Sequence, residues 1–177
     1  MREMLHQDTT PRYYTRAELS LMRSAQWREL LASLGVAVAN SLTEVPHSNQ
    51  LFVTNCCGTK GVGIPHGTPD VFYLGTKQQQ FYREMTANGF EWAILSDLYG
   101  MHFATESLPL YDLAPSQLTQ EQLWDLGRLI RRKFLERYGG VPRVVYCKAP
   151  VSTAVPYIIM LLAAGCPLTL SLSCAHK

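Results

Sequence analysis

The sequence has few charged residues and no long apolar run. Lys, Arg, Asp and Glu make up 17% of its 177 residues, and the net charge is +2. That charge is too small to indicate nucleic-acid binding from bulk electrostatics. The longest apolar stretch, residues 155–165, is too short to cross a bilayer, so no membrane association is expected. Sparse charge leaves apolar surface uncovered, which favours a homo-oligomer.

The cysteines also lack the spacing of a metal or redox motif. The chain has five of them, at positions 56, 57, 147, 166 and 174, and no Cys-x-x-Cys pair. A zinc ribbon and a thioredoxin-type motif are therefore excluded. The N-terminal residues hold no apolar run of the kind a signal peptide needs. We predict free thiols, a cytoplasmic location, and neither a metal nor another cofactor.

Apolar strands alternate with amphipathic helices along the chain. Strands are predicted at residues 51–54, 92–96, 144–147 and 168–172, helices at 77–87, 119–138 and 153–165, and a long loop at 99–118. Continuous apolar strands joined by helices are typical of a mostly parallel sheet with helices on both faces. The sequence therefore predicts a single Rossmann-like α/β domain over residues 51–177, preceded by an N-terminal arm and helix over residues 1–50.

Polar and small residues follow two of these strands. The first segment is Asn55-Cys56-Cys57-Gly58-Thr59-Lys60. Such a turn can present backbone N–H groups and an ammonium to an anion, and either thiol can serve as nucleophile or pocket wall. The plain structural alternative is a tight turn with buried thiols. The Gly-x-x-x-x-Gly-Lys-Ser/Thr spacing of a phosphate-binding loop is absent.

The second segment runs from Ser96 to Asp112. It opens Leu95-Ser96-Asp97-Leu98-Tyr99-Gly100 and closes Pro109-Leu110-Tyr111-Asp112, with Glu106 between. Ligands of parallel sheets bind beyond the carboxyl ends of the strands, so both segments should lie at one sheet edge. An ordinary strand-to-loop turn is the alternative. His66 and His102 also follow strand ends, although a lone loop histidine is more often a surface residue.

Together the two segments resemble the YaaA-like superfamily. The matching residues are Cys57-Gly58-Thr59-Lys60, Tyr73-Leu74-Gly75, Leu95 to Gly100, and Pro109 to Asp112. That superfamily includes DNA-associated peroxide-stress proteins, small domains found near 7-deazaguanine modification genes, and a domain related to one in archaeosine synthase. The resemblance covers about residues 50–165. The insert Gly61 to Thr68 and the residues Phe103-Ala104-Thr105 depart from the family pattern.

The resemblance implies an enzyme that acts on a nucleobase, a nucleotide or a base within a nucleic acid. The residues expected to be catalytic are Cys56, Cys57, Lys60 and Asp112, and those expected to bind substrate are Asn55, Gly58, Thr59, Ser96, Tyr99, Gly100, Glu106 and Tyr111. Two alternatives stay open. One is a non-catalytic DNA- or RNA-binding protein that uses the basic residues of 128–137; the other is a small-molecule sensor or assembly subunit.

Overall fold

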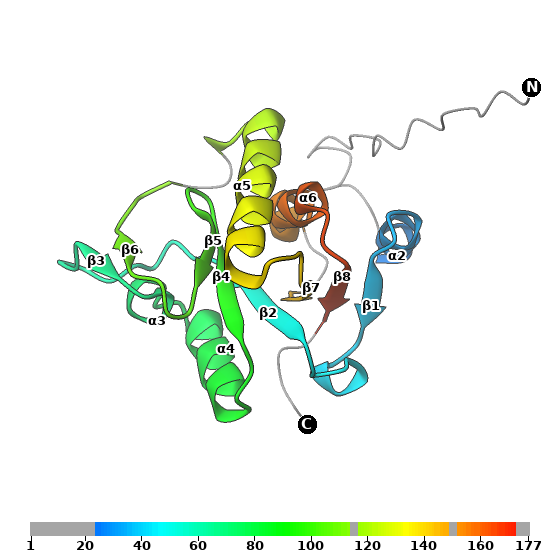
Figure 1. Ribbon diagram of the computed structural model, residues 1–177, viewed down its shortest axis with the longest axis horizontal. Coiled ribbons are helices and arrows are strands. Elements are labelled where there is room, and N and C mark those ends of the chain that lie inside the picture. The colour runs from blue at the N-terminus through cyan, green and yellow to red at the C-terminus, as the bar shows by residue number, and fades with distance from the viewer. Residues whose placement is uncertain (1–23, 114–116, 149–151, 173–177) are drawn as a thin grey trace, which may run out of the picture.

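Buried apolar strands form a six-stranded sheet with the order β1-β8-β7-β2-β4-β5 (Figure 1). The computed structural model describes residues 24–113, 117–148 and 152–172. In chain order the strands of this sheet are β1 (Ala37–Ala39), β2 (Gln50–Asn55), β4 (Trp92–Ser96), β5 (Gly100–Phe103), β7 (Arg143–Cys147) and β8 (Leu168–Ser171). All neighbours are parallel except β5, which runs antiparallel to β4. The predicted mostly parallel α/β sheet is confirmed.

Helices cover the sheet on both faces. They are α2 (Ser24–Ser33), α3 (Pro69–Phe72), α4 (Thr76–Ala87), α5 (Gln120–Tyr138) and α6 (Val155–Ala164), with 3-10 turns at Leu42–Glu44 and Ser152–Ala154. Helices α5 and α6 pack side by side (Figure 1). Gly127 permits this approach, because a Cβ there would lie 2.4 Å from Cβ of Ala163. Because crossovers between parallel strands are right-handed in nearly all proteins, the strand order puts α4 on the opposite face from α6.

The chain order creates a topological switch point at β2. From β2 the chain passes through α4 to β4 on one side, and later returns to place β7 on the other side. The connections that leave the carboxyl ends of β2 and β7 therefore diverge to opposite faces of the sheet. Open α/β sheets bind ligands in the crevice left at such a point.

The helix over residues 120–138 begins and ends as its sequence predicts. The Thr119 hydroxyl accepts the Gln122 N–H while the Gln122 side chain accepts the Thr119 N–H. This reciprocal cap satisfies two backbone donors and stabilises the helix by about 1 kcal/mol. Gly139 ends the helix at φ 68°, in the left-handed region that glycine adopts without a steric penalty.

The predicted loop over residues 99–118 is wrong in part. After a tight turn the chain doubles back as β5, and Leu108–Pro109 (β6) then pairs with His66–Gly67 (β3) in a small separate sheet. Strand β5 is buried along its whole length. The polar His102 at its centre interrupts the apolar run, which is why the pattern did not reveal a strand.

The segment before residue 50 shares the sheet and the core. Strand β1 pairs in parallel with β8, and the side chains of Trp27 and Leu31 in α2 are buried. Residues 1–23 of the predicted N-terminal arm and helix lie outside the described residues. Within the described part of the chain no helix is long and apolar enough to span a membrane. The four described cysteines, Cys56, Cys57, Cys147 and Cys166, form no disulfide, and Cys174 lies outside that part.

Candidate functional site

The two site-like segments meet at one edge of the sheet. Strands β2 and β4 are parallel neighbours, with Asn55 opposite Leu95. The Cys56 N–H continues the ladder beyond β2 by donating to the Leu95 carbonyl at 2.9 Å. The sequence prediction that these segments lie close together at the same edge is therefore confirmed.

A cavity of about 370 Å³ opens at this edge, at the switch point, and we call it the switch-point cleft. Its wall comes from the ends of β2 and β4, the first turns of α4 and α6, and the residues after β7. The lining residues are Asn55, Cys56, Cys57, Gly58, Lys60, Gln78, Asp97, Asp112, Leu113, Lys148, Thr153 and Tyr157. A second hollow of about 450 Å³ shares Gly58, Lys60 and Asp112 and adds Leu110 and Tyr111.

Asp97 is the buried carboxylate of the switch-point cleft. Asp97 is the residue directly after β4, and it is only 1% exposed. The Cys56 thiol donates to Oδ2 at 3.0 Å, whereas Oδ1 has no hydrogen-bond partner among the described residues. Burial raises the pKa of Asp97, and the hydrogen bonds with Cys56 and Tyr157 and the charge of Lys60 offset part of that rise. The Asp97 carboxyl group therefore binds a proton more readily than an exposed aspartate does.

Cys56 is a buried hydrogen-bond donor. Its side chain is 5% exposed, and its sulfur also lies 3.4 Å from the Tyr157 hydroxyl. Burial, reinforced by the nearby Asp97 charge, raises the pKa of the Cys56 thiol to about 12. The thiol therefore stays protonated at neutral pH, which fits a pocket wall rather than a nucleophile.

Asn55 gives the cleft a second acceptor without a partner. The side chain is 8% exposed, and its Nδ2 donates to the Cys56 carbonyl at 2.7 Å. Its Oδ1 has no hydrogen-bond partner among the described residues. Gln78 of α4 donates to the Asn55 backbone carbonyl at 2.9 Å and so fixes this end of β2. A buried acceptor without a partner costs about 1–3 kcal/mol, which a bound donor would recover.

Lys60 lines both hollows and contacts Tyr111, which lines the second. The Lys60 ammonium donates to the Tyr111 carbonyl at 2.8 Å and lies 3.8 Å from the centre of the Tyr111 ring. The Tyr111 hydroxyl accepts from Ser96 Oγ at 2.8 Å and from the Asp97 N–H at 3.3 Å. Lys60 therefore both presents positive charge to the cleft and holds the 108–112 segment over β4.

Ser96 and Tyr99 support the site without lining the switch-point cleft. Ser96 Oγ accepts the Leu98 and Tyr99 N–H groups at 3.3 and 3.0 Å, which closes the turn between β4 and β5. The Tyr99 hydroxyl donates to the Pro109 carbonyl at 2.8 Å, and its ring packs edge-on against Tyr111. Both residues thus position Tyr111.

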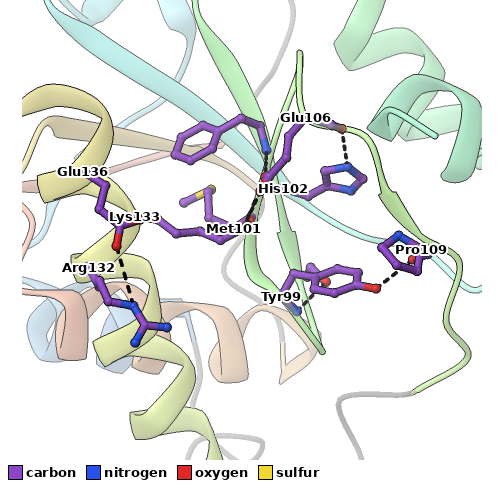
Figure 2. Close-up of polar contacts among 10 residues, drawn as sticks. Tyr99, Met101, His102, Glu106, Pro109, Arg132, Lys133 and Glu136 are labelled. Atoms are coloured by element: carbon purple, nitrogen blue, oxygen red, sulfur yellow. Dashed lines mark hydrogen bonds and ion pairs between the residues drawn. The ribbon is translucent and has the colours of Figure 1, made fainter. Parts of the chain in front are cut away.

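Glu106 and Gly100 face α5 instead of the cleft. The Glu106 carboxylate pairs with Lys133 at 3.0 Å, and Lys133 also donates to the Met101 carbonyl at 2.6 Å (Figure 2). The Glu106 carbonyl lies 2.7 Å from Nε2 of the buried His102. Gly100, at φ 66°, packs against Ile130, whose side chain would lie 2.9 Å from an added Cβ. His66 is exposed in β3.

The remaining predicted residues are Asp112, which follows β6, and Cys57, Gly58 and Thr59 in the turn after β2. Gly58 and Asp112 line both hollows. The Thr59 carbonyl accepts from the Cys57 thiol at 3.2 Å and from the Leu74 N–H at 2.9 Å, so Thr59 shapes the turn. Cys57 is half-buried in the cleft wall.

Five lining residues with polar side chains were not predicted from the sequence as site residues. Asp97 lies within the second segment, and the others are Gln78, Lys148, Thr153 and Tyr157. Lys148 and Tyr157 follow β7, whose carboxyl end forms the other side of the switch point. The rule that ligands lie beyond strand ends, applied to this third strand, would have found them.

The basic residues of α5 form intramolecular contacts. Arg128 pairs with Asp125, Arg132 with Glu136, and Arg137 with Glu91, while Lys133 pairs with Glu106 and Arg131 donates to the Ala164 carbonyl. Figure 2 shows the Lys133 and Arg132 side chains on α5. We call these five cations the α5 basic face.

Comparison with protein-family models, with curated proteins and with solved structures finds no match to this chain. Its chemistry must therefore be argued from the cleft. Within the described residues, no three His, Cys, Asp or Glu side chains lie close enough to hold a metal ion. The lining instead offers buried acceptors, two ammonium groups and two thiols.

Proposed function

We propose that the protein is an enzyme that binds and modifies a nucleobase, either free, in a nucleotide or in a nucleic acid, within the switch-point cleft. The observation that carries the proposal is Asp97, a buried carboxylate with one unpartnered oxygen in the cleft wall. A buried charged acceptor of this kind calls for a ligand that supplies a donor.

The size and the polar groups of the cleft support this class of ligand. Cavities of about 300–1,000 Å³ hold small molecules, and 370 Å³ lies at the lower end of that range. Asp97 and Asn55 offer acceptors to ring N–H and exocyclic amino groups. Lys60 and Lys148 bring ammonium groups that favour an anionic portion such as a phosphate.

The raised pKa of Asp97 supports an enzyme over a passive binder. Burial is its main cause, and it moves the carboxyl group toward the range in which a general acid or base works near neutral pH. The resemblance to the YaaA-like superfamily implies the same class of substrate. The alternative, a nucleic-acid-binding protein that uses the α5 basic face, has weaker support because those cations bind partners within the chain.

A ligand panel tests the proposal. Nucleobases, nucleosides, nucleoside 5′-monophosphates and short single-stranded oligonucleotides are titrated into the protein by calorimetry, and each mixture is then analysed by mass spectrometry for altered bases. We expect saturable binding of at least one base-containing ligand and its loss in Asp97→Ala. Asp125→Ala, on the exposed side of α5, serves as the matched carboxylate control. Binding that survives Asp97→Ala would overturn the proposed site.

A further inference from the structure

The adjacent thiols Cys56 and Cys57 lie in opposite chemical environments. Cys56 is buried and donates to Asp97 at 3.0 Å, and its proton is retained because burial raises its pKa to about 12. Cys57 is half-buried, with its sulfur in the wall of the switch-point cleft. Only the second thiol is therefore placed to react with a molecule in the cleft.

Backbone groups of Thr59 and Gly75 hold the Cys57 sulfur in place, and we call this arrangement the Cys57 seat. The Gly75 N–H donates to it at 3.3 Å, and its own proton points to the Thr59 carbonyl at 3.2 Å. Gly75 is the residue that precedes α4, a helix of 12 residues. A Cβ on Gly75 would lie 2.9 Å from this sulfur and 2.5 Å from Oε1 of Gln78, so the seat requires glycine.

Two features of this seat favour chemistry at Cys57. The N-terminus of a helix favours negative charge, and an N–H donor stabilises charge that develops on the sulfur. Independently, Asp97 and Asn55 line the same cleft, are at least nine-tenths buried, and each carries an unpartnered oxygen. Cys57 therefore shares the wall of one cleft with these two residues.

We infer that Cys57 is the nucleophile of the switch-point cleft and that Cys56 is a positioning residue that orients Asp97. This inference rests on the proposed function. The ligand that it implies carries an unsaturated, electrophilic carbon, as in a C=O or C=N group, beside a hydrogen-bond donor.

The covalent step balances with groups that line the cleft. The Cys57 thiol releases its proton to water, and its sulfur lone pair forms a bond to the electrophilic carbon. The π pair of that carbon moves onto the attached nitrogen or oxygen, which takes a proton back from water. Asp97 stays a carboxylate that accepts the Cys56 hydrogen bond and the donor of the ligand, and the reverse transfer releases the adduct.

Affinity labelling tests the inference in the full chain carrying Cys174→Ser. The reagents are 2-chloroacetamide and the 5′-chloroacetamido-5′-deoxy derivatives of adenosine and guanosine, each of which alkylates a thiol with loss of chloride. Peptide mass spectrometry at pH 7 reports the site and the rate. We expect Cys57 to react at least about tenfold faster than Cys56, and a nucleoside reagent to show a rate that saturates with concentration.

Failure of the inference is distinguishable from failure of the proposed function. Labelling of Cys56 ahead of Cys57 overturns the assignment of the nucleophile, even when the nucleoside reagents saturate. Selective labelling of Cys57 without saturation supports that assignment and counts against the nucleobase ligand.

A pair of glycine variants tests whether the backbone around the sulfur, and not its exposure alone, sets the reactivity of Cys57. Gly75→Ala displaces the sulfur and should slow labelling of Cys57 several-fold, whereas Gly140→Ala, where an added Cβ meets nothing within 4 Å, should leave it unchanged. Equal labelling rates of Cys57 in both variants would show that Gly75 does not position the sulfur for reaction. If melting shows Gly75→Ala to be unfolded, Cys57→Ser replaces it: nucleotide binding is expected to persist while the adduct disappears, and an adduct that persists contradicts the assignment.

Discussion

The switch-point cleft and the α5 basic face both concentrate polar groups, but they differ in how those groups are satisfied. Each cation of the α5 basic face contacts an oxygen of the same chain, and the Arg128–Asp125 and Arg132–Glu136 pairs are largely exposed. In the cleft, Asp97 and Asn55 are buried with an oxygen that has no partner among the described residues. The first pattern suits a solvated helix surface, and the second suits a site that waits for a ligand.

The contrast shows why local charge is a poor guide to function in this protein. Exposed ion pairs contribute about 0–1 kcal/mol each and are easily replaced. A buried acceptor without a partner lowers stability by about 1–3 kcal/mol, and a bound donor would recover that free energy. Substitutions in each region test this difference.

The largest effect is expected from Asp97→Asn in the cleft. The folded-state pKa of Asp97 is raised, so its stabilising contribution is complete below the unfolded value and is lost as pH rises through the folded value. At neutral pH the amide should therefore raise the melting temperature. It should also weaken nucleotide binding by about 1.5–3 kcal/mol, the scale of a charge-assisted hydrogen bond. Calorimetry and melting of the same sample measure both, and lower stability with intact binding would make Asp97 structural.

Lys60→Ala should have the next largest effect, divided between binding and stability. The ammonium faces the cleft but also contacts the Tyr111 carbonyl and ring. We expect nucleotide affinity to fall by about 1.5–3 kcal/mol and stability by about 1 kcal/mol. Thermal melting and calorimetry separate the two. Unchanged affinity with a large loss of stability would remove Lys60 from the binding site.

A smaller effect is expected from acid on the β5 side of the molecule. Burial lowers the pKa of His102. The stability that its neutral form contributes is complete above the unfolded value, near 6.5, and is lost as pH falls through the lower folded value. Melting temperature should therefore fall as the pH drops below about 6.5. His102→Gln should flatten this part of the profile, and an unaltered slope would assign the loss to another group.

The smallest effect is expected on the α5 basic face. The double variant Arg128→Gln, Arg132→Gln removes two ion pairs whose side chains are more than half exposed. Stability should change by less than about 1 kcal/mol, and nucleotide affinity should be unchanged. Filter binding of oligonucleotides at several salt concentrations provides the check. A large, salt-dependent loss of nucleic-acid affinity would instead favour the binding-protein alternative.

Much of the fold could be predicted from local patterns. The apolar runs that became β2, β4 and β7, and the reciprocal cap at Thr119, depend on residues close together in the sequence. Strand β5 could not, because its burial depends on contacts with the distant helix α5, and the buried His102 finds its partner only once the chain has turned back.

The position of the candidate site could be predicted from the sequence, but the roles of its residues could not. The rule that ligands bind beyond strand ends pointed to Asn55, the two thiols and the segment after β4. The roles depend on distant residues: Tyr157 and Asp97 decide that Cys56 is a buried donor, and Gly75 seats Cys57. Glu106 was predicted to bind substrate from its position in the second segment. It pairs instead with Lys133 of α5, which lies 27 residues away in the sequence.

The central claim, that the switch-point cleft binds the ligand and the α5 basic face does not, is tested most directly by an amide NMR titration. Uniformly ¹⁵N-labelled protein is titrated with the nucleotide that binds best by calorimetry. We expect the chemical shifts of the backbone amides of Cys56, Cys57, Asp97 and Tyr157 to change, and those of residues 128–137 to stay the same. Shifts confined to residues 128–137, with the cleft amides unmoved, would contradict it.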